Sequence, residues 1–205
     1  MVINIKLTTV ATLICAATVS CNGCKDILGC ESSYKFQLDC RVSPNKDTIS
    51  RGDTVWIQIS SPVVFTDQIS GEQIDYSNAS NLGTDIGFQK LISSAPVQVA
   101  NAVSDFNFVL RTGIEINSSN PEGDKNYLIN EVSNKYVFNL GIIAKDTGTF
   151  RFFLSSSVNV EQSGKPCPKA DFDIIMVQTN QHYYLYPGMD SVSTASSNYL
   201  FYVKQ

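Results

Sequence analysis

The chain contains few of the residues from which active sites are usually built. Its 205 residues include one histidine and one tryptophan, and no Gly-x-Ser-x-Gly turn occurs in the sequence. A Ser-His-Asp or Cys-His system would have to use His182, and a histidine-based metal site needs more than one imidazole. We therefore expect no catalytic residues, no metal site and no cofactor.

Positive charge is also scarce. Fifteen lysines and arginines stand against 19 aspartates and glutamates, which gives a net charge of −4, and no basic cluster is visible. Because nucleic acids are bound by clustered cations that neutralise phosphates, a nucleic-acid partner is excluded. Only 17% of the residues are charged, while serine, asparagine and threonine are abundant. Such a composition suits an exported surface that is solvated by neutral polar groups.

The longest apolar run lies near the amino terminus, over residues 7–19, and is too short for a membrane span of about 20 residues. Lys6 precedes the run and the small residue Ser20 follows it. A basic start, an apolar centre and a small residue at the exit indicate a secretory signal. The sequence thus predicts a signal peptide at residues 1–20, a tether at residues 21–33 and one domain at residues 34–205.

The end of this segment, Thr18-Val19-Ser20-Cys21, resembles the signal of bacterial lipoproteins. In that family the cysteine thiol receives a diacylglycerol and the chain is cut before it. The resemblance implies a lipid on Cys21 that holds the protein at the outer membrane or cell surface, since two or three acyl chains anchor a protein stably. The alternatives are ordinary cleavage near Ser20, which leaves Cys21 to pair with another cysteine, and an uncleaved anchor.

Six cysteines are present, of which Cys15 lies inside the signal. If Cys21 carries lipid, four remain, and four cysteines allow three pairings that the sequence cannot distinguish. Our hypothesis is Cys24 with Cys30 and Cys40 with Cys167. A zinc site is the competing interpretation, but Cys24 and Cys30 lack CxxC spacing and no histidine lies near them.

Alternating apolar and polar residues predict β-strands along the rest of the chain. The clearest is residues 34–42, where the alternation directs Cys40 inward, and Gly113 is expected to form a bulge inside another strand. Residues 96–104 fit a short helix or a strand, and residues 161–170 are expected to form a loop. The remaining strands are predicted at residues 54–60, 86–92, 106–116, 127–132, 135–144, 149–160, 171–179, 182–186 and 199–203. Short strands with frequent turns predict an all-β fold, an antiparallel β-sandwich.

Two resemblances add to this prediction. The segment Asp146-Thr147-Gly148-Thr149-Phe150 resembles the D-x-G-x-Y corner of immunoglobulin-like sandwiches, with phenylalanine in place of the tyrosine. Phe152 stands where antibody domains have a cysteine, so the likeness implies an immunoglobulin-like sandwich without that inter-sheet disulfide. With its lipid signal, residues 47–59 and its aromatic ending, the whole chain resembles uncharacterised cell-surface lipoproteins of Bacteroidetes-type bacteria, a group that implies no activity.

Aromatic residues near the carboxyl terminus are the candidate ligand contacts, although core packing would explain them as well. Trp56 has the same two interpretations: packing under a loop or second sheet, or a ligand platform. We expect a non-catalytic surface module that binds a glycan or a protein. The alternatives are a pilus-like assembly subunit with an open sheet edge and a hydrolase, for which Asp171 and Asp173 would be the carboxylate pair. The candidate contact residues are Tyr183, Tyr184, Tyr186, Tyr199 and Tyr202.

Overall fold

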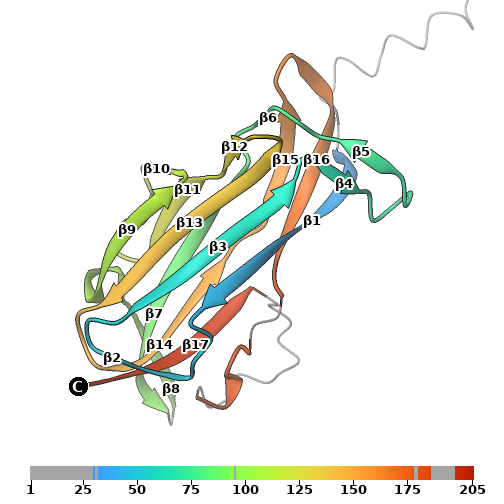
Figure 1. Ribbon diagram of the computed structural model, residues 1–205. Coiled ribbons are helices and arrows are strands. Elements are labelled where there is room, and N and C mark those ends of the chain that lie inside the picture. Colours follow the sequence, from blue (N-terminus) through green and yellow to red (C-terminus); the bar gives the residue numbers. More distant parts are fainter. Residues whose placement is uncertain (1–29, 31, 95, 178–179, 186–196) are drawn as a thin grey trace, which may run out of the picture. The chain divides into compact units, whose positions relative to one another are not determined.

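The computed structural model describes residues 30, 32–94, 96–177, 180–185 and 197–205 (Figure 1). The chain divides into two units, Met1–Glu31 and Ser32–Gln205, and the second holds all of the secondary structure described below. The predicted signal peptide, Cys21 and Cys24 lie outside the described residues, so the predictions about them stand untested.

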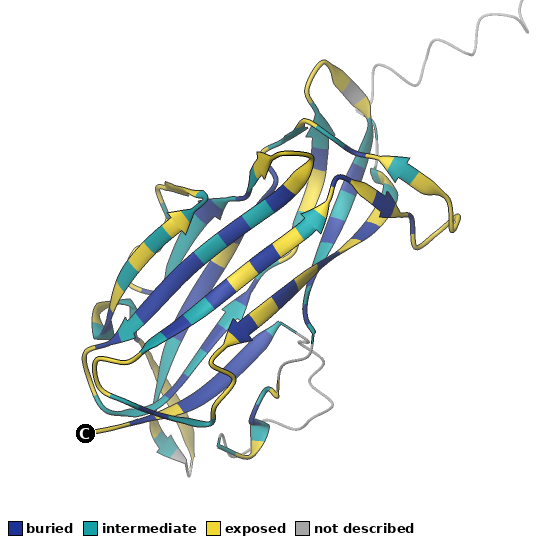
Figure 2. Ribbon diagram, in the orientation of Figure 1, coloured by how far each residue is buried: buried dark blue, intermediate teal, exposed yellow. Residues whose placement is uncertain are grey.

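Strand β1 (Ser32–Ser43) shows how the sequence pattern produces the fold. Phe36, Leu38 and Cys40 are fully buried, while the residues between them are exposed. Figure 2 shows the same alternation along β1 and β3 (Thr54–Pro62). Since successive side chains of a strand point to opposite faces, each strand places one face in the core and the other in water.

Two sheets enclose the core. Sheet A, the front layer in Figure 1, has the order β12-β13-β3-β1-β16-β15-β6, and β9 lies beside β13. Its other strands are β6 (Ala79–Ser80), β9 (Phe106–Thr112), β12 (Asn130–Val132), β13 (Lys135–Ala144), β15 (Ser157–Gln162) and β16 (Lys165–Met176).

Sheet B lies behind sheet A and has the order β10-β11-β7-β14-β17-β2, with β8 beside β7. Its strands are β2 (Thr48–Ser50), β7 (Gly83–Ser94), β8 (Val97–Asn101), β10 (Ile114–Ile116), β11 (Asp124–Leu128), β14 (Gly148–Leu154) and β17 (Asn198–Lys204). A separate two-stranded sheet joins β4 (Val64–Thr66) to β5 (Gln73–Asp75), and η2 (Val103–Asp105) and η3 (Tyr183–Leu185) are 3-10 helices.

The predicted fold class, an all-β sandwich, is confirmed, while its likeness to immunoglobulin domains stays a prediction. Strand pairs are antiparallel except for β1 with β16 and β17 with β2, which are parallel. Within the described ranges no helix is long and apolar enough to cross a membrane.

Aromatic rings fill much of the space between the sheets. Phe36 lies 5.2 Å from Phe172 and 5.1 Å from Phe65, and Phe106 lies 4.9 Å from Phe150, measured between ring centroids. Aromatic pairs at such distances each contribute about 0.5–1.5 kcal/mol beyond the burial of their area. The polar end of buried Tyr76 is satisfied, because its hydroxyl donates to the Val160 carbonyl at 2.6 Å.

Three of the predicted strands are each divided between the two sheets. Residues 106–116 form β9 in sheet A and β10 in sheet B, residues 127–132 fall in β11 and β12, and residues 149–160 fall in β14 and β15. The bulge predicted at Gly113 is wrong. This glycine has φ +124° and stands where the chain leaves one sheet for the other, a conformation that other residues rarely adopt.

Other local predictions also need correction. Most of the loop expected at residues 161–170 belongs to the β15–β16 hairpin, whose turn contains Gly164 at φ +76°. Residues 96–104 form strand β8 followed by the start of η2, which resolves the choice between helix and strand. The strand expected at residues 182–186 is wrong where the structure describes it, because Tyr183–Leu185 is the 3-10 helix η3.

The predicted disulfide pairing is wrong. Cys30 is bonded to Cys167, and Cys40 is a free thiol buried in the core. Cys40 lies in the middle of β1, where burial raises the pKa of its thiol to about 12.

Candidate functional site on the outer face of sheet A

A row of polar side chains crosses the solvent-facing side of sheet A. The strand register places Arg41 of β1 opposite Gln58 of β3, Gln58 opposite Asn139 of β13, and Asn139 opposite Thr112 of β9. We call these four residues the polar row. Each lies on the outward side of its strand, because the residues that alternate with them, such as Ile57, Ile59 and Phe138, are in the core.

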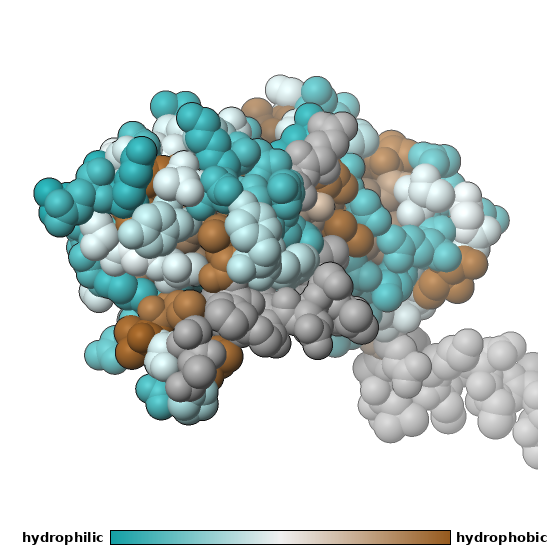
Figure 3. Space-filling model, turned by 90° about the horizontal axis from the view of Figure 1, so that it is seen from below, coloured by the Kyte–Doolittle hydropathy of each residue, from teal (hydrophilic) through white to brown (hydrophobic). Residues whose placement is uncertain are grey.

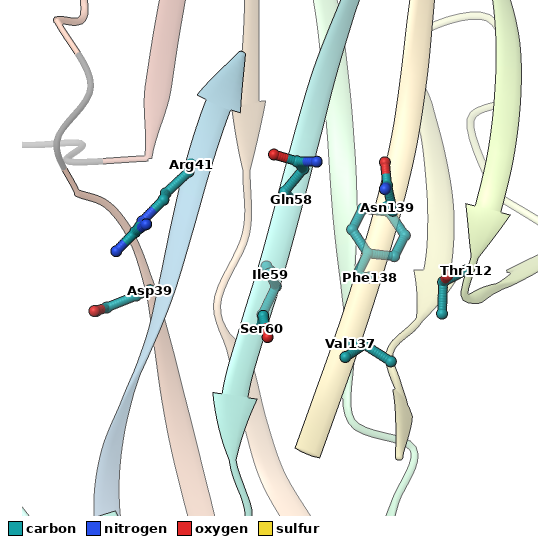
Figure 4. A pocket seen from close by; sticks show the side chains of 9 residues that line it. All are labelled: Asp39, Arg41, Gln58, Ile59, Ser60, Thr112, Val137, Phe138 and Asn139. Carbon is teal, nitrogen blue, oxygen red and sulfur yellow. The ribbon is translucent and has the colours of Figure 1, made fainter. Parts of the chain in front are cut away.

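The polar row lies in a hollow of about 520 Å³. Asp39 and Ser60 extend the lining by one level along β1 and β3, and Val137 does so along β13 (Figure 4). Ligand pockets in proteins typically measure about 300–1,000 Å³, so the hollow has the size of a small-ligand or oligosaccharide site.

Asn139 is the unusual member of the row. Its side-chain oxygen Oδ1 is buried and has no hydrogen-bond partner among the described residues. A buried polar atom without a partner costs about 1–3 kcal/mol, and such atoms are rare enough in folded proteins to require an explanation. Asn139 lines the hollow, so its amide is the member of the row that a bound molecule could supply with the missing hydrogen bond.

Next to the row, Trp56 lies on the outer face of sheet A. This position matches neither of the packing interpretations of Trp56, under a loop or against a second sheet. Trp56 stands opposite Gly141 in the β3–β13 register. A Cβ atom on Gly141 would come within 2.8 Å of the indole atom Cζ3, so the ring lies directly over the glycine. The guanidinium carbon of Arg111 lies 3.8 Å from the centre of the indole ring.

The position of Arg111 follows from an irregularity in β9. Leu110 pairs with Leu140 and Thr112 pairs with Asn139, so Arg111 is an extra residue between two consecutive pairs. An extra residue of this kind is a β-bulge, which bends the strand and redirects a side chain. Here the redirected side chain stacks on Trp56, beside the polar row.

Charges on this face are partly free. Lys35 forms an ion pair with Asp173 at 3.2 Å, and Asp39 accepts a hydrogen bond from Gln37 at 2.7 Å. Arg41 and Arg111, in contrast, form no ion pair within the described part of the chain. The face therefore presents two guanidinium groups that a ligand can reach.

Among the described residues, the tyrosines predicted as ligand contacts are not brought to this face. Tyr199 is fully buried and its hydroxyl donates to the Lys46 carbonyl at 2.7 Å, so its prediction as a contact residue is wrong. Tyr184 is 69% exposed and its hydroxyl donates to Asp47, and Tyr202 is 42% exposed on β17 of sheet B. Tyr183 is half-buried in η3, and Tyr186 lies outside the described residues.

The other candidates for chemistry have structural partners. His182 is 4% exposed and its ring nitrogen Nδ1 lies 3.0 Å from the Leu200 carbonyl, to which it donates. Asp171 accepts hydrogen bonds from the Ser32 hydroxyl at 2.7 Å and from the Asn159 amide at 2.9 Å. Among the residues that the structure describes, no group of three or more His, Cys, Asp or Glu side chains is arranged to hold a metal ion.

A second exposed feature lies at the edge of sheet B. All five residues of β8 are exposed, and Ile92, Val97 and Val99 are apolar residues exposed by 59%, 45% and 42%. In Figure 3, apolar side chains gather on the projecting end where Figure 1 places β8. Residues 91–104 contain no charged residue, and β7 is the one strand paired with β8 in the described ranges.

Comparison with known proteins finds no related sequence and only weak structural likeness. No protein-family model matches the sequence, and no curated protein matches it. One similar structure is the type II cohesin dyad from the adaptor ScaA scaffoldin of Acetivibrio cellulolyticus, with a TM-score of 0.31 and 9% identity over 69% of this chain. A type II cohesin domain from the cellulosome of the same organism has a TM-score of 0.28 and 11% identity over 68% of this chain.

This chain spans 47% of the cohesin dyad and 92% of the single cohesin domain. At such low TM-scores the likeness carries no argument about this chain. The resemblance to Bacteroidetes-type lipoproteins, which the sequence suggested, finds no matching family and stays a prediction.

Proposed function

We propose that the protein is an exported, non-catalytic module that binds a glycan on the outer face of sheet A. The observation that carries this proposal is the unpartnered Oδ1 of Asn139 within the hollow. Glycan hydroxyl groups both donate and accept hydrogen bonds. A hydroxyl that donates to Asn139 would remove the cost of the open acceptor, and the complex would gain that free energy.

The rest of the polar row supports the same ligand class. Gln58 and Asn139 carry amides, Thr112 carries a hydroxyl and Arg41 carries only donors. This mixture of neutral donors and acceptors suits a ligand covered with hydroxyl groups. A protein partner on the same face is the competing outcome of the test below.

Export is supported by the bond between Cys30 and Cys167, because disulfides form and persist mainly in oxidising compartments. The lipid on Cys21 is part of the proposal. Labelling cells with a palmitate analogue tests it: we expect label on the wild type and none on Cys21→Ser, and equal labelling of the two would show that Cys21 is not the anchor.

Binding is tested by affinity electrophoresis of the purified domain through gels that contain a panel of polysaccharides. We expect retardation by at least one polysaccharide, and loss of retardation in Asn139→Ala. Asn126→Ala is the matched control, since Asn126 is an asparagine of β11 in sheet B. Equal retardation of Asn139→Ala and the wild type would contradict the site, and no retardation by any polysaccharide would contradict glycan binding.

The exposed strand β8 favours one further candidate function, assembly through sheet edges. Edge strands are usually protected by charges or proline, whereas β8 carries no charge. A second copy of this chain could pair with it antiparallel without like-charge repulsion. Sedimentation velocity tests this: the wild type should form dimers at high concentration and Val99→Lys should not, while monomers in both samples would exclude assembly through β8.

A further inference from the structure

We infer that the glycan bound at the polar row is acidic, and that Arg111 and Arg41 bind its anionic groups. This inference rests on the proposed function and narrows its ligand class.

Arg111 is held in place before any ligand arrives. Its guanidinium lies 3.8 Å from the centre of the Trp56 ring, and that ring lies over Gly141. A cation stacked on an aromatic ring contributes about 0.5–1 kcal/mol at an exposed site. Because stacking uses one flat face of the guanidinium, the N–H groups along its edge stay available as donors.

The edge of a guanidinium matches one kind of ligand group especially well. Its N–H groups form a fixed fork that pairs with the two oxygens of a carboxylate, or with two oxygens of a sulfate, through parallel hydrogen bonds. An arginine that is fixed by stacking loses less conformational entropy on binding than a free one. The Trp56, Gly141 and Arg111 arrangement is therefore suited to bind an oxyanion.

Arg41 provides the second cation. It is exposed at the β1 end of the polar row and forms no ion pair within the described part of the chain. Asp39, the carboxylate in the same hollow, accepts a hydrogen bond from Gln37 rather than from Arg41. The charge of Arg41 is thus available at the rim of the hollow.

The two arginines stand on strands that are not neighbours in sheet A. Arg41 lies on β1 and Arg111 on β9, and the sheet order β9-β13-β3-β1 separates these strands by three intervals. At about 4.8 Å for each interval, the two backbones are about 14 Å apart. The guanidinium of Arg111 reaches across β13 to Trp56 of β3, so the two charged groups lie closer together than the two backbones. A chain of acidic sugars laid along the row meets both cations.

Affinity electrophoresis with paired polymers tests the inference. The acidic polymers are polygalacturonate, which carries carboxylates, and dextran sulfate, which carries sulfates. Fully methyl-esterified polygalacturonate and dextran are their neutral counterparts. We expect the wild type to bind one or both acidic polymers and to bind the neutral forms at least about tenfold more weakly, the loss typical of a charge-assisted pair.

Two variants assign this preference to the arginines. Arg41→Gln and Arg111→Gln should each weaken binding of the acidic polymer about tenfold. Lys135→Gln, which removes an exposed cation at the end of β13, should change it less than about threefold. The cation stacked on Trp56 is Arg111 and not Arg41. Arg41→Gln therefore remains informative if Arg111→Gln disturbs folding.

The outcomes separate the inference from the proposed function. Equal binding of acidic and neutral forms, or equal binding by both arginine variants and the wild type, overturns the acidic ligand and leaves glycan binding intact. If Lys135→Gln weakens binding as much as Arg41→Gln does, the polymer is bound through its charge alone. That outcome also overturns the assigned site. Failure of all four polymers and of the wider polysaccharide panel overturns both proposals.

Discussion

The stack of Trp56 on Gly141 gives the most quantitative prediction, through the substitution Gly141→Ala. The new Cβ would lie 2.8 Å from Cζ3 and 3.0 Å from Cη2 of the indole, and 3.1 Å from Cγ2 of Thr54. Carbon atoms in contact prefer about 3.5–4.0 Å, so the ring must move by at least about half an ångström. That movement shifts the indole ring away from Gly141 of β13 and disturbs the contact between the ring and the Arg111 guanidinium.

The expected cost follows from three contributions. Overpacking costs about 1–3 kcal/mol, and weakening the cation–π contact costs about 0.5–1 kcal/mol. Replacing glycine within a strand returns roughly 0.5–1 kcal/mol of backbone entropy. We therefore expect the free energy of unfolding to fall by about 1–3 kcal/mol, with a fall in Tm of about 2–4 °C per kcal/mol for a chain of this size.

Urea unfolding followed by tryptophan emission measures both effects, because Trp56 is the sole tryptophan. We expect a lower midpoint and a changed emission maximum in Gly141→Ala. Ser60→Ala, an exposed position on the same face of β3, is the control and should change neither. A Gly141→Ala protein with wild-type stability and wild-type emission would refute the packing of the Trp56 ring on Gly141 of β13.

Three further predictions concern the rest of the sandwich. Cys167→Ser should lower the free energy of unfolding by about 2–5 kcal/mol, as expected for loss of a disulfide that closes a long loop, and a wild-type unfolding midpoint would contradict this. Because burial raises the pKa of Cys40 to about 12, a thiol reagent should label Cys40 after unfolding and leave it unlabelled in the folded chain. Asp67 accepts hydrogen bonds from the Lys35 amide at 2.8 Å and from the Ser70 amide at 2.9 Å, and these lower its pKa to about 2. A lowered folded-state pKa stabilises the protein above the unfolded value of about 3.9. The stability that Asp67 provides should therefore be lost between about pH 4 and pH 2, and acid titration of Asp67→Asn should show a shallower loss over that interval than the wild type.

The strands of sheet A that carry the site could be predicted well from the sequence. Residues 34–42 alternate strictly and residues 54–60 and 135–144 largely do, and they form the central strands β1, β3 and β13. Alternation also marks which residues face solvent, so Arg41, Gln58 and Asn139 could each be assigned outward. It does not give the register between strands, and the register alone makes these residues neighbours.

Crossings between sheets were the main source of error. A chain that continues its period-2 pattern through a crossing reads as one long strand, as residues 106–116 and 149–160 do. The glycine at position 113 is consistent with the crossing, because the φ of +124° found there suits glycine. In a sequence, however, a glycine within a strand equally indicates a bulge. Local pattern cannot separate the two.

The candidate binding residues were misjudged for a related reason. The sequence indicates the tyrosines near the carboxyl terminus as ligand contacts. Tyr199, however, packs in the core, with its ring centroid 5.2 Å from that of Phe152. Aromatic residues are common both in protein cores and at ligand-binding surfaces, so their presence in a segment does not distinguish the two roles. The unpartnered oxygen of Asn139 and the stack on Trp56 depend on neighbours that are far away in the chain, and neither is visible in a single segment.

The location of the bound glycan is tested most directly by amide chemical shifts recorded during titration with the polysaccharide that the wild type binds. We expect the largest changes at the side-chain amides of Gln58 and Asn139 and at the backbone amide of Thr112, with little change along β14 of sheet B. Changes concentrated on sheet B or on β8, with the amides of the polar row unmoved, would contradict the assignment of the site.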